Sequence, residues 1–219
     1  MKLISIIVGA ALAALCGCTA ITPVQQQYSG FLGDYNGLQP VQVADGSKAM
    51  RWVNPELKKG KYKKIIVPQV AFFPAPRASS QVSLETLTQI SLQMTQQLRA
   101  ELGKQFTVTD KPGPDTANFQ IAITGVDTPT EGLKPYEIIP IALVFASAST
   151  ATGARDHVSV VYVEGIATDA LTGEELAKGV RQGVGLSLEN DQEKLSIQKL
   201  KPLIDGWAKE MGQLSGNLL

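Results

Sequence analysis

The chain contains two cysteines, Cys16 and Cys18, and their spacing restricts the chemistry that they could do. Thiol–disulfide exchange uses a C-x-x-C pair, whereas only one residue separates these two. A structural zinc site needs four ligands, and the sequence offers neither a second cysteine pair nor more than one histidine. We therefore expect no redox site, no metal and no other cofactor.

The residues before the cysteines are typical of an export signal. Lys2 supplies a positive charge, and the twelve residues 3–14 that follow are uncharged. A helix of that length would measure about 18 Å, too short for a hydrocarbon core of ~30 Å, so we expect no transmembrane helix. An ordinary secretory leader and a lipoprotein leader are the two alternatives.

The stretch "LCGC", residues 15–18, favours a lipoprotein leader because it resembles the bacterial lipobox, in which cleavage occurs directly before a lipidated cysteine. Cys18 has a glycine before it, whereas a cut before Cys16 would place the bulky Leu15 at the cleaved bond. The resemblance implies a signal peptide over residues 1–17 and lipidation of Cys18.

A lipidated Cys18 would carry acyl chains such as palmitate on its sulfur and on its amino group. Each buried methylene contributes ~0.8 kcal/mol, so three chains would hold the protein stably in a membrane. By resemblance to lipoprotein sorting, an Asp after the lipidated cysteine favours the inner membrane, and Thr19 stands there instead. We therefore expect a cell-envelope protein at the periplasmic face of the outer membrane.

The remaining sequence shows no catalytic motif. His157 is the sole histidine and begins a predicted strand, where we expect an exposed or capping role. No G-x-S-x-G elbow presents a serine nucleophile. The acid–base material consists of carboxylates: Asp34, Glu56, Asp127, Glu131, Asp156, Glu164 and Asp169. Glu164 interrupts an apolar strand, and we expect it to be paired with Arg51 or Arg181, or to lie at a sheet edge.

The charge balance argues against binding of nucleic acid. The chain has 20 Lys and Arg against 20 Asp and Glu, without a basic stripe. The one basic cluster is residues 58–64, "KKGKYKK", which we interpret as a solvated turn before a strand. Contact with anionic lipid headgroups or an anionic wall polymer is the alternative.

The mature chain is predicted to consist of a tether and one domain. Residues 18–29 comprise Cys18 and an uncharged linker, and residues 30–219 form the domain. The domain begins with a glycine-rich loop that carries Phe31 and Tyr35. We expect these aromatic side chains to dock onto another surface, and they are candidate partner contacts.

Periodicity predicts two amphipathic helices. The first covers residues 83–103, with Ser83 as N-cap and Leu87, Ile90, Met94 and Leu98 facing a sheet. The second covers residues 200–214, with Trp207 and Met211 facing the sheet and Pro202 in its first turn. Strands are predicted at 63–73, 106–109, 118–126, 157–169 and 174–188. Their order indicates an α+β fold: a mixed, mainly antiparallel sheet with two amphipathic helices packed on it.

A proline and several glycines predict irregular geometry in two of these strands. Pro68 predicts an edge position or a bulge within 63–73. The glycines at 179, 183 and 185 do not form a G-x-G-x-x-G motif, and we interpret them as relief for a twisted or bulged strand.

Residues 138–154, "IIPIALVFASASTATGA", are uncharged and include Phe145 and Ala146. A continuous short apolar run is usually part of a core, which is the interpretation that we favour. The alternative makes Phe145 and Ala146 contacts to a second copy, to another protein or to the membrane surface.

Several stretches together resemble a family of bacterial lipoproteins that share domain of unknown function 3313. They are "SGFLGDYNGL", "RWVNPEL", "GLKPYEIIPIALVFASASTATG" and "DALTGEEL". The resemblance implies an envelope lipoprotein and no established activity.

Two hypotheses for function follow. The first is a non-enzymatic binding or assembly module facing the periplasm, whose partner is an envelope protein, a second copy or an envelope polymer. The second is a carboxylate-dependent enzyme that acts on cell-wall glycan. We favour the first, because no set of residues satisfies the geometric requirements of a catalytic site even in outline.

Overall fold

The computed structural model describes residues 28–43, 47–128, 157–190 and 192–219. The predicted signal peptide, Cys18 and most of the tether lie outside these ranges. The same holds for Glu131, Asp156, Phe145 and Ala146, so the predictions for these residues stand as made.

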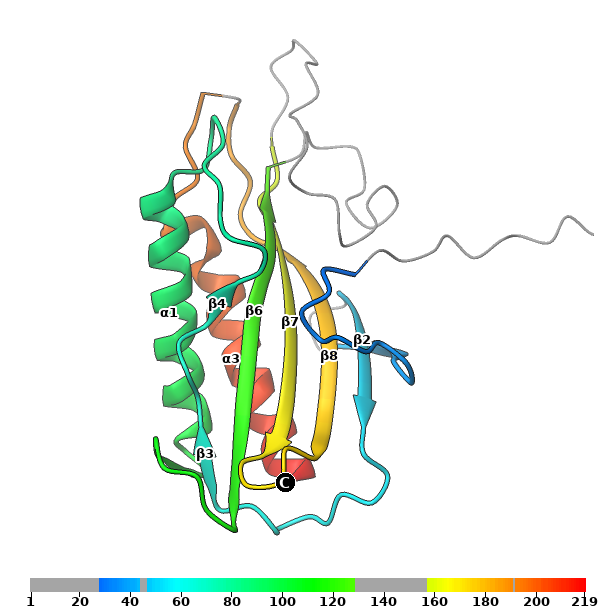
Figure 1. Ribbon diagram of the computed structural model, residues 1–219. Coiled ribbons are helices and arrows are strands. Elements are labelled where there is room, and N and C mark those ends of the chain that lie inside the picture. Colours follow the sequence, from blue (N-terminus) through cyan, green and yellow to red (C-terminus); the bar gives the residue numbers. More distant parts are fainter. Residues whose placement is uncertain (1–27, 44–46, 129–156, 191) are drawn as a thin grey trace, which may run out of the picture.

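The described residues form one α+β domain around an open, mixed, mostly antiparallel sheet (Figure 1). The eight strands follow the order β1-β2-β8-β7-β6-β3-β5, and β4 pairs with β6. The pairs from β1 through β6 are antiparallel, whereas β3, β4 and β5 join in parallel. The strand bounds are β1 Gln39–Gln42, β2 Lys48–Val53, β3 Lys64–Ile66, β4 Ala71–Phe72, β5 Thr107–Val108, β6 Thr116–Asp127, β7 Val160–Asp169 and β8 Glu175–Val184.

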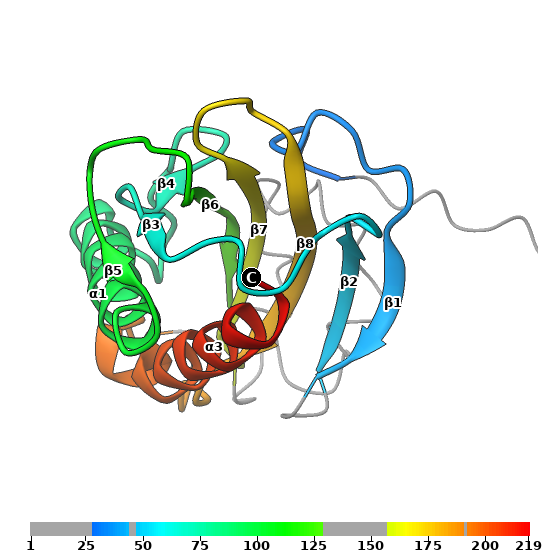
Figure 2. The same cartoon turned by 90° about the horizontal axis from the view of Figure 1, so that it is seen from below.

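Two helices, α1 (Leu84–Leu102) and α3 (Ile197–Leu218), cover one face of this sheet within the described ranges. Ser83 caps α1 as predicted, because its side chain accepts a hydrogen bond from the Thr86 N–H. The prediction for α3 was wrong at its start: the helix begins at Ile197, so Pro202 lies in the second turn. Figure 2 shows α1 and α3 side by side, with α1 beside β3 and β5, α3 below β6 to β8, and β1 and β2 extending beyond them.

The helix-covered face holds the larger core. The predicted stripe of α1 is buried there, and Trp207 of α3 is buried with it, whereas Met211 is partly buried. The prediction of two amphipathic helices packed on the sheet is thus confirmed. In the described part of the chain no helix is long and apolar enough to cross a membrane.

A second, smaller core lies on the opposite face of the sheet. Residues 28–38, which we call the strap, cover this face, and Leu32 and Leu38 of the strap are buried against the strands. The buried strand residues are Val160, Tyr162 and Val180. The loop prediction for this glycine-rich segment is confirmed, since Gly30, Gly33 and Gly37 all adopt positive φ.

The predicted strands need correction at three points. Strands β1 and β2 were not predicted. Residues 63–73 form two short strands, β3 and β4, rather than one, and exposed Pro68 lies between them. The strand expected to reach residue 188 ends at Val184.

Candidate functional site

Small residues from two adjacent strands, β7 and β8, lie beside one another on the helix-covered face. Gly165 of β7 pairs with Gly179 of β8, and Gly179 pairs with Arg51 of β2. In a neighbouring row, Ala167 pairs with Ala177. Side chains alternate between the faces of a strand, so these positions point toward the helices, where Ala167 belongs to the larger core. The sheet is therefore hollowed along this row.

One stripe of α3 forms the opposite wall of a groove over this hollow. The stripe consists of Ile204, Trp207, Met211, Leu214 and Leu218. Met94 and Leu98 of α1 close the inner end, and Ala49 and Arg51 of β2 bound the side that the helices leave uncovered (Figure 2). The cavity has a volume of about 160 Å³. We take this groove as the candidate binding site.

Three of the charged residues that line the groove belong to its helix-covered side, namely Arg51, Arg181 and Glu210. Arg181 of β8 forms an ion pair with Glu210 of α3 at 2.9 Å, and its guanidinium lies 5.0 Å from the centre of the Trp207 ring. Arg51 is half-buried and has no ion pair among the described residues. Glu210 therefore pairs with Arg181, whereas Arg51 has no carboxylate within ion-pair distance among the described residues.

We expected the glycines at 179, 183 and 185 to relieve a twisted or bulged strand, and the bulge is not found at Gly179 or Gly183 of β8 or at Gly185 just after it. The β7–β8 register shifts between Ala167 and Thr168, away from all three glycines. Gly183 instead makes room for α3, because a Cβ there would lie 2.3 Å from Cζ2 of Trp207. A Cβ at Gly185 would lie 2.7 Å from Cδ2 of Leu200 in α3 and 2.6 Å from the Ser159 hydroxyl. These glycines therefore allow α3 to approach the end of β8 closely.

Glu164 lies on the opposite face from the groove, under the strap. Its carboxylate accepts hydrogen bonds from the Tyr35 hydroxyl at 2.6 Å and from the Ser29 N–H at 3.0 Å. The expectation of a pairing with Arg51 or Arg181, or of an edge position, was wrong. Glu164 is fully buried in central strand β7, and its donors are uncharged groups of the strap. Burial and the hydrogen bond to Glu164 raise the pKa of Tyr35.

A second polar contact joins the strap to β8. The Lys178 ammonium lies 3.2 Å from the Asp34 carboxylate and 3.1 Å from Glu175. Only 3% of the Lys178 side chain is exposed, and its ammonium also lies 5.4 Å from the centre of the Trp52 ring. Hydrogen bonds from the Asn36 N–H and from Lys178 hold the pKa of Asp34 below its usual range.

The aromatic residues of the strap dock onto this domain. The Phe31 ring centre lies 5.8 Å from that of Phe73, which is outside the strap, and the Tyr35 ring stacks within the strap on Tyr28 with 4.1 Å between ring centres. Gly37 fits against Trp52, because a Cβ at this positive-φ position would come within 2.7 Å of Cδ1 of that ring. Phe31 and Tyr35 remain partly exposed, so their predicted contact with a partner stays a prediction.

The carboxylates considered for catalysis are spread along the sheet. Asp127 pairs with Val160, and Asp169 lies nine residues further along β7, about 30 Å away at ~3.3 Å per residue. Burial raises the pKa of Asp127. Burial alone would also raise the pKa of Asp169. Hydrogen bonds from the Thr172 and Leu171 N–H groups instead hold this pKa well below its usual range. Glu56 is exposed.

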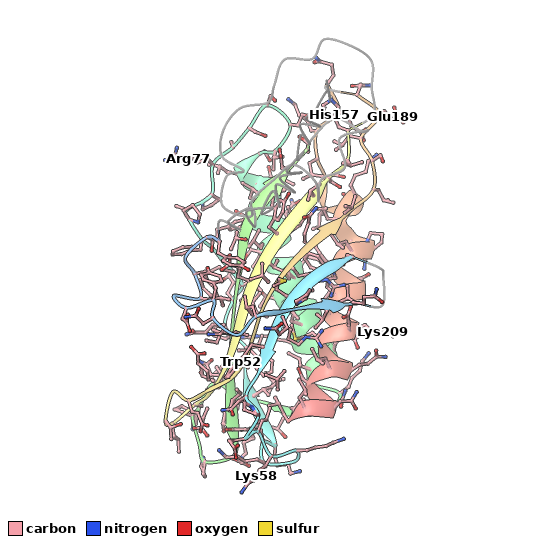
Figure 3. All side chains as sticks on the ribbon, turned by 90° about the vertical axis from the view of Figure 1, so that its right-hand side faces the viewer. Trp52, Lys58, Arg77, His157, Glu189 and Lys209 are labelled. Carbon is pink, nitrogen blue, oxygen red and sulfur yellow. The ribbon has the colours of Figure 1, made fainter. Side chains whose placement is uncertain are left out.

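His157 and the basic cluster lie at opposite ends of the molecule (Figure 3). The Nδ1 atom of His157 lies 2.8 Å from the Thr128 carbonyl, and the partly buried residue forms an isolated bridge to Leu188 three residues before β7, so it does not begin that strand as predicted. Most of segment 58–64 is exposed before β3, and its Lys61 lies 3.2 Å from Asp169. The described residues contain no group of three or more His, Cys, Asp or Glu that could hold a metal ion.

The fold and the site define a single α+β domain in which two helices cover one face of a mixed sheet. An apolar groove lies between helix α3 and this sheet. The chain belongs to the family described as "Protein of unknown function (DUF3313)", which matches residues 27–211. It is 35% identical over 199 residues to the uncharacterized lipoprotein YdcL of Escherichia coli K12, covering 91% of this chain and 90% of that protein. YdcL of Escherichia coli O157:H7 matches to the same extent.

Solved structures are similar at low identity. The PelC dodecamer of Paraburkholderia phytofirmans matches with 11% identity and a TM-score of 0.34, over 72% of this chain and 96% of that chain. The hypothetical protein CT253 of Chlamydia trachomatis matches with 8% identity and a TM-score of 0.34, over 72% and 91% of the two chains. Neither likeness bears on function.

Proposed function

We propose that this protein is a lipid-anchored component of the bacterial cell envelope whose domain binds an apolar partner without catalysing a reaction. The groove between α3 and strands β2, β7 and β8 carries this proposal. Apolar side chains line it, and a few charged groups lie at its side, as is usual for a binding site. The lipobox at residues 15–18 and the lipoprotein relatives support the anchor.

The location follows from the same residues. Cys18 is the lipid acceptor, and Thr19 after it lacks the inner-membrane signal, so the domain faces the periplasm from the outer membrane. The strap begins ten residues after Cys18, and the groove is therefore held close to the membrane surface by a short tether.

A non-enzymatic role is favoured by the positions of the carboxylates. Glu164 is fully buried and bonded to Tyr35 and Ser29, and Asp169 is bonded to its own turn and to Lys61. A glycan hydrolase needs two carboxyl groups about 5 to 9 Å apart across a cleft. Solubilisation of purified cell-wall glycan by the wild-type chain, abolished by Glu164→Gln, would support the enzyme instead.

The anchor is tested by feeding cells labelled palmitate and separating their membranes on a density gradient. Wild type and Cys16→Ala should carry label and sediment with outer-membrane markers, whereas Cys18→Ala should lose both properties. Label that persists in Cys18→Ala would overturn the anchor site. Sedimentation of the wild type with inner-membrane markers would overturn the location.

A further inference from the structure

We infer that the groove takes the acyl chain of an anionic amphiphile of the fatty-acid class, with its carboxylate at Arg51. The inference rests on the proposed function in one respect, namely that the groove is a binding site. It goes further by assigning the ligand and the residues that select it.

The apolar part of the ligand is specified by the shape of the groove. The stripe of α3 from Ile204 to Leu218 is about 21 Å long at 1.5 Å per residue, so the wall is elongated. Opposite it, Gly165 and Gly179 have no side chains and so deepen the floor at these two positions. An apolar cavity of about 150 Å³ in another protein stays dry and takes up a small hydrocarbon. The cavity of about 160 Å³ here is large enough for part of an alkyl chain.

The polar part of the ligand is specified by charge. Five ionisable side chains border the groove, which the last residue, Leu219, also lines: Arg51, Glu164, Lys178, Arg181 and Glu210. Glu164 and Lys178 direct their charged groups to the strap on the other face, and Arg181 is paired with Glu210. Arg51 is thus the one cationic side chain at the groove that has no ion pair among the described residues. A ligand carboxylate would pair with the Arg51 guanidinium through charge-assisted hydrogen bonds.

This arrangement favours a fatty acid over an uncharged chain. A neutral chain, including the diacylglycerol thioether expected on Cys18, would bury its methylenes equally well but would leave Arg51 unpaired. A docked apolar helix from a second copy is the other occupant that such a groove could take, and it would require an acidic residue beside its apolar stripe.

The inference is tested with the mature chain, residues 18–219, carrying Cys18→Ala so that it is soluble without lipid. Titration calorimetry would measure binding of palmitate below its aggregation concentration, with hexadecanol as the uncharged probe. Two variants alter the site. Gly165→Val fills the floor, where a Cβ would meet Ile121 at 3.4 Å, an ordinary contact. Arg51→Gln removes the charge.

Arg77→Gln is the matched control, since exposed Arg77 lies between β4 and α1, away from β2 (Figure 3). We expect wild type and Arg77→Gln to bind palmitate alike. Arg51→Gln should bind palmitate about tenfold more weakly, as loss of one charge-assisted hydrogen bond implies, with hexadecanol binding unchanged. Gly165→Val should lose both probes while its urea midpoint shows that it is folded.

Three outcomes would overturn the inference. They are no palmitate binding by the folded wild type, equal loss in Arg51→Gln and Arg77→Gln, and concentration-dependent dimers that Gly165→Val abolishes without any effect of palmitate. None of these results changes where labelled lipid attaches. A result against fatty-acid binding in the groove can therefore be distinguished from a result against the lipid anchor at Cys18.

Discussion

The Tyr35 hydroxyl donates a 2.6 Å hydrogen bond to the carboxylate of Glu164, and the two residues are 129 positions apart in the chain. The bond joins the strap to the central strand β7, and the Ser29 N–H donates to the other oxygen of the same carboxylate. Because Glu164 is fully buried, it has no access to water that could replace these donors. The strap is therefore fixed to the sheet through Ser29 and Tyr35.

Removal of the Tyr35 hydroxyl should destabilise the domain. Tyr35→Phe leaves the buried carboxylate with one donor fewer, which we expect to lower the free energy of unfolding by about 1–3 kcal/mol. Urea melts at constant m-value would measure this. Tyr162→Phe is the matched control, because the buried Tyr162 hydroxyl has no hydrogen-bond partner in the described part of the chain. That variant should be neutral or more stable, and equal losses in both would contradict the role given to Glu164.

The helices and the central strands could be predicted from the sequence because each carries its own periodic pattern. Leu87, Ile90, Met94 and Leu98 recur at helical spacing, and all are buried. Strands β1 and β2 gave no such signal. β1 has only four residues, starts directly after the glycine-rich strap and contains Pro40. Its pairing with β2 depends on tertiary contacts rather than on local preference.

The groove could not be predicted, because its floor is made by register rather than by any one segment. Gly165 and Gly179 are fourteen positions apart and adjoin only when β7 pairs with β8. Glu164 could be singled out as a charge in an apolar strand. Its partner could not, since nothing local to either residue indicates that Tyr35 reaches it from the strap.

Substitution by alanine should have opposite effects on stability at two glycines, Gly183 against α3 and Gly206 within it. At Gly183 a Cβ would lie 2.3 Å from Trp207 and 2.6 Å from Leu203, so Gly183→Ala should cost about 1–3 kcal/mol through overpacking. Within α3 a Cβ at Gly206 would meet nothing within 4 Å. Gly206→Ala should therefore stabilise by about 0.5–1 kcal/mol through helix propensity. Thermal melts of both variants would measure the difference, and the same sign for both would contradict the packing described here.

Truncation of the helix side chains that face the sheet should have large effects. Leu98→Ala and Trp207→Ala should each lower the free energy of unfolding by about 2–5 kcal/mol, because each removes a buried side chain from the larger core. The exposed Leu92 of α1 is the matched control, and Leu92→Ala should cost less than about 0.5 kcal/mol. Losses below ~1 kcal/mol for both core variants in urea would mean that these stripes do not face a packed core.

The contribution of Asp169 to stability should decline in acid. Its carboxylate accepts hydrogen bonds from the Leu171 and Thr172 N–H groups and from the Tyr62 hydroxyl, and Lys61 lies 3.2 Å away. These contacts hold the pKa of the folded state below the value of about 3.9 that an unfolded chain has. A depressed pKa stabilises the fold above the unfolded pKa, and this stabilisation is lost as the pH falls toward the folded pKa.

Asp169→Asn should thus cost roughly 1–2 kcal/mol at pH 7, through weaker hydrogen bonds, and clearly less at pH 3. Urea melts at both pH values would measure the two differences, with exposed Glu56→Gln as a control that should cost little at either pH. A penalty for Asp169→Asn that stays the same or grows at pH 3 would show that the charge of this carboxylate does not hold the β7–β8 turn.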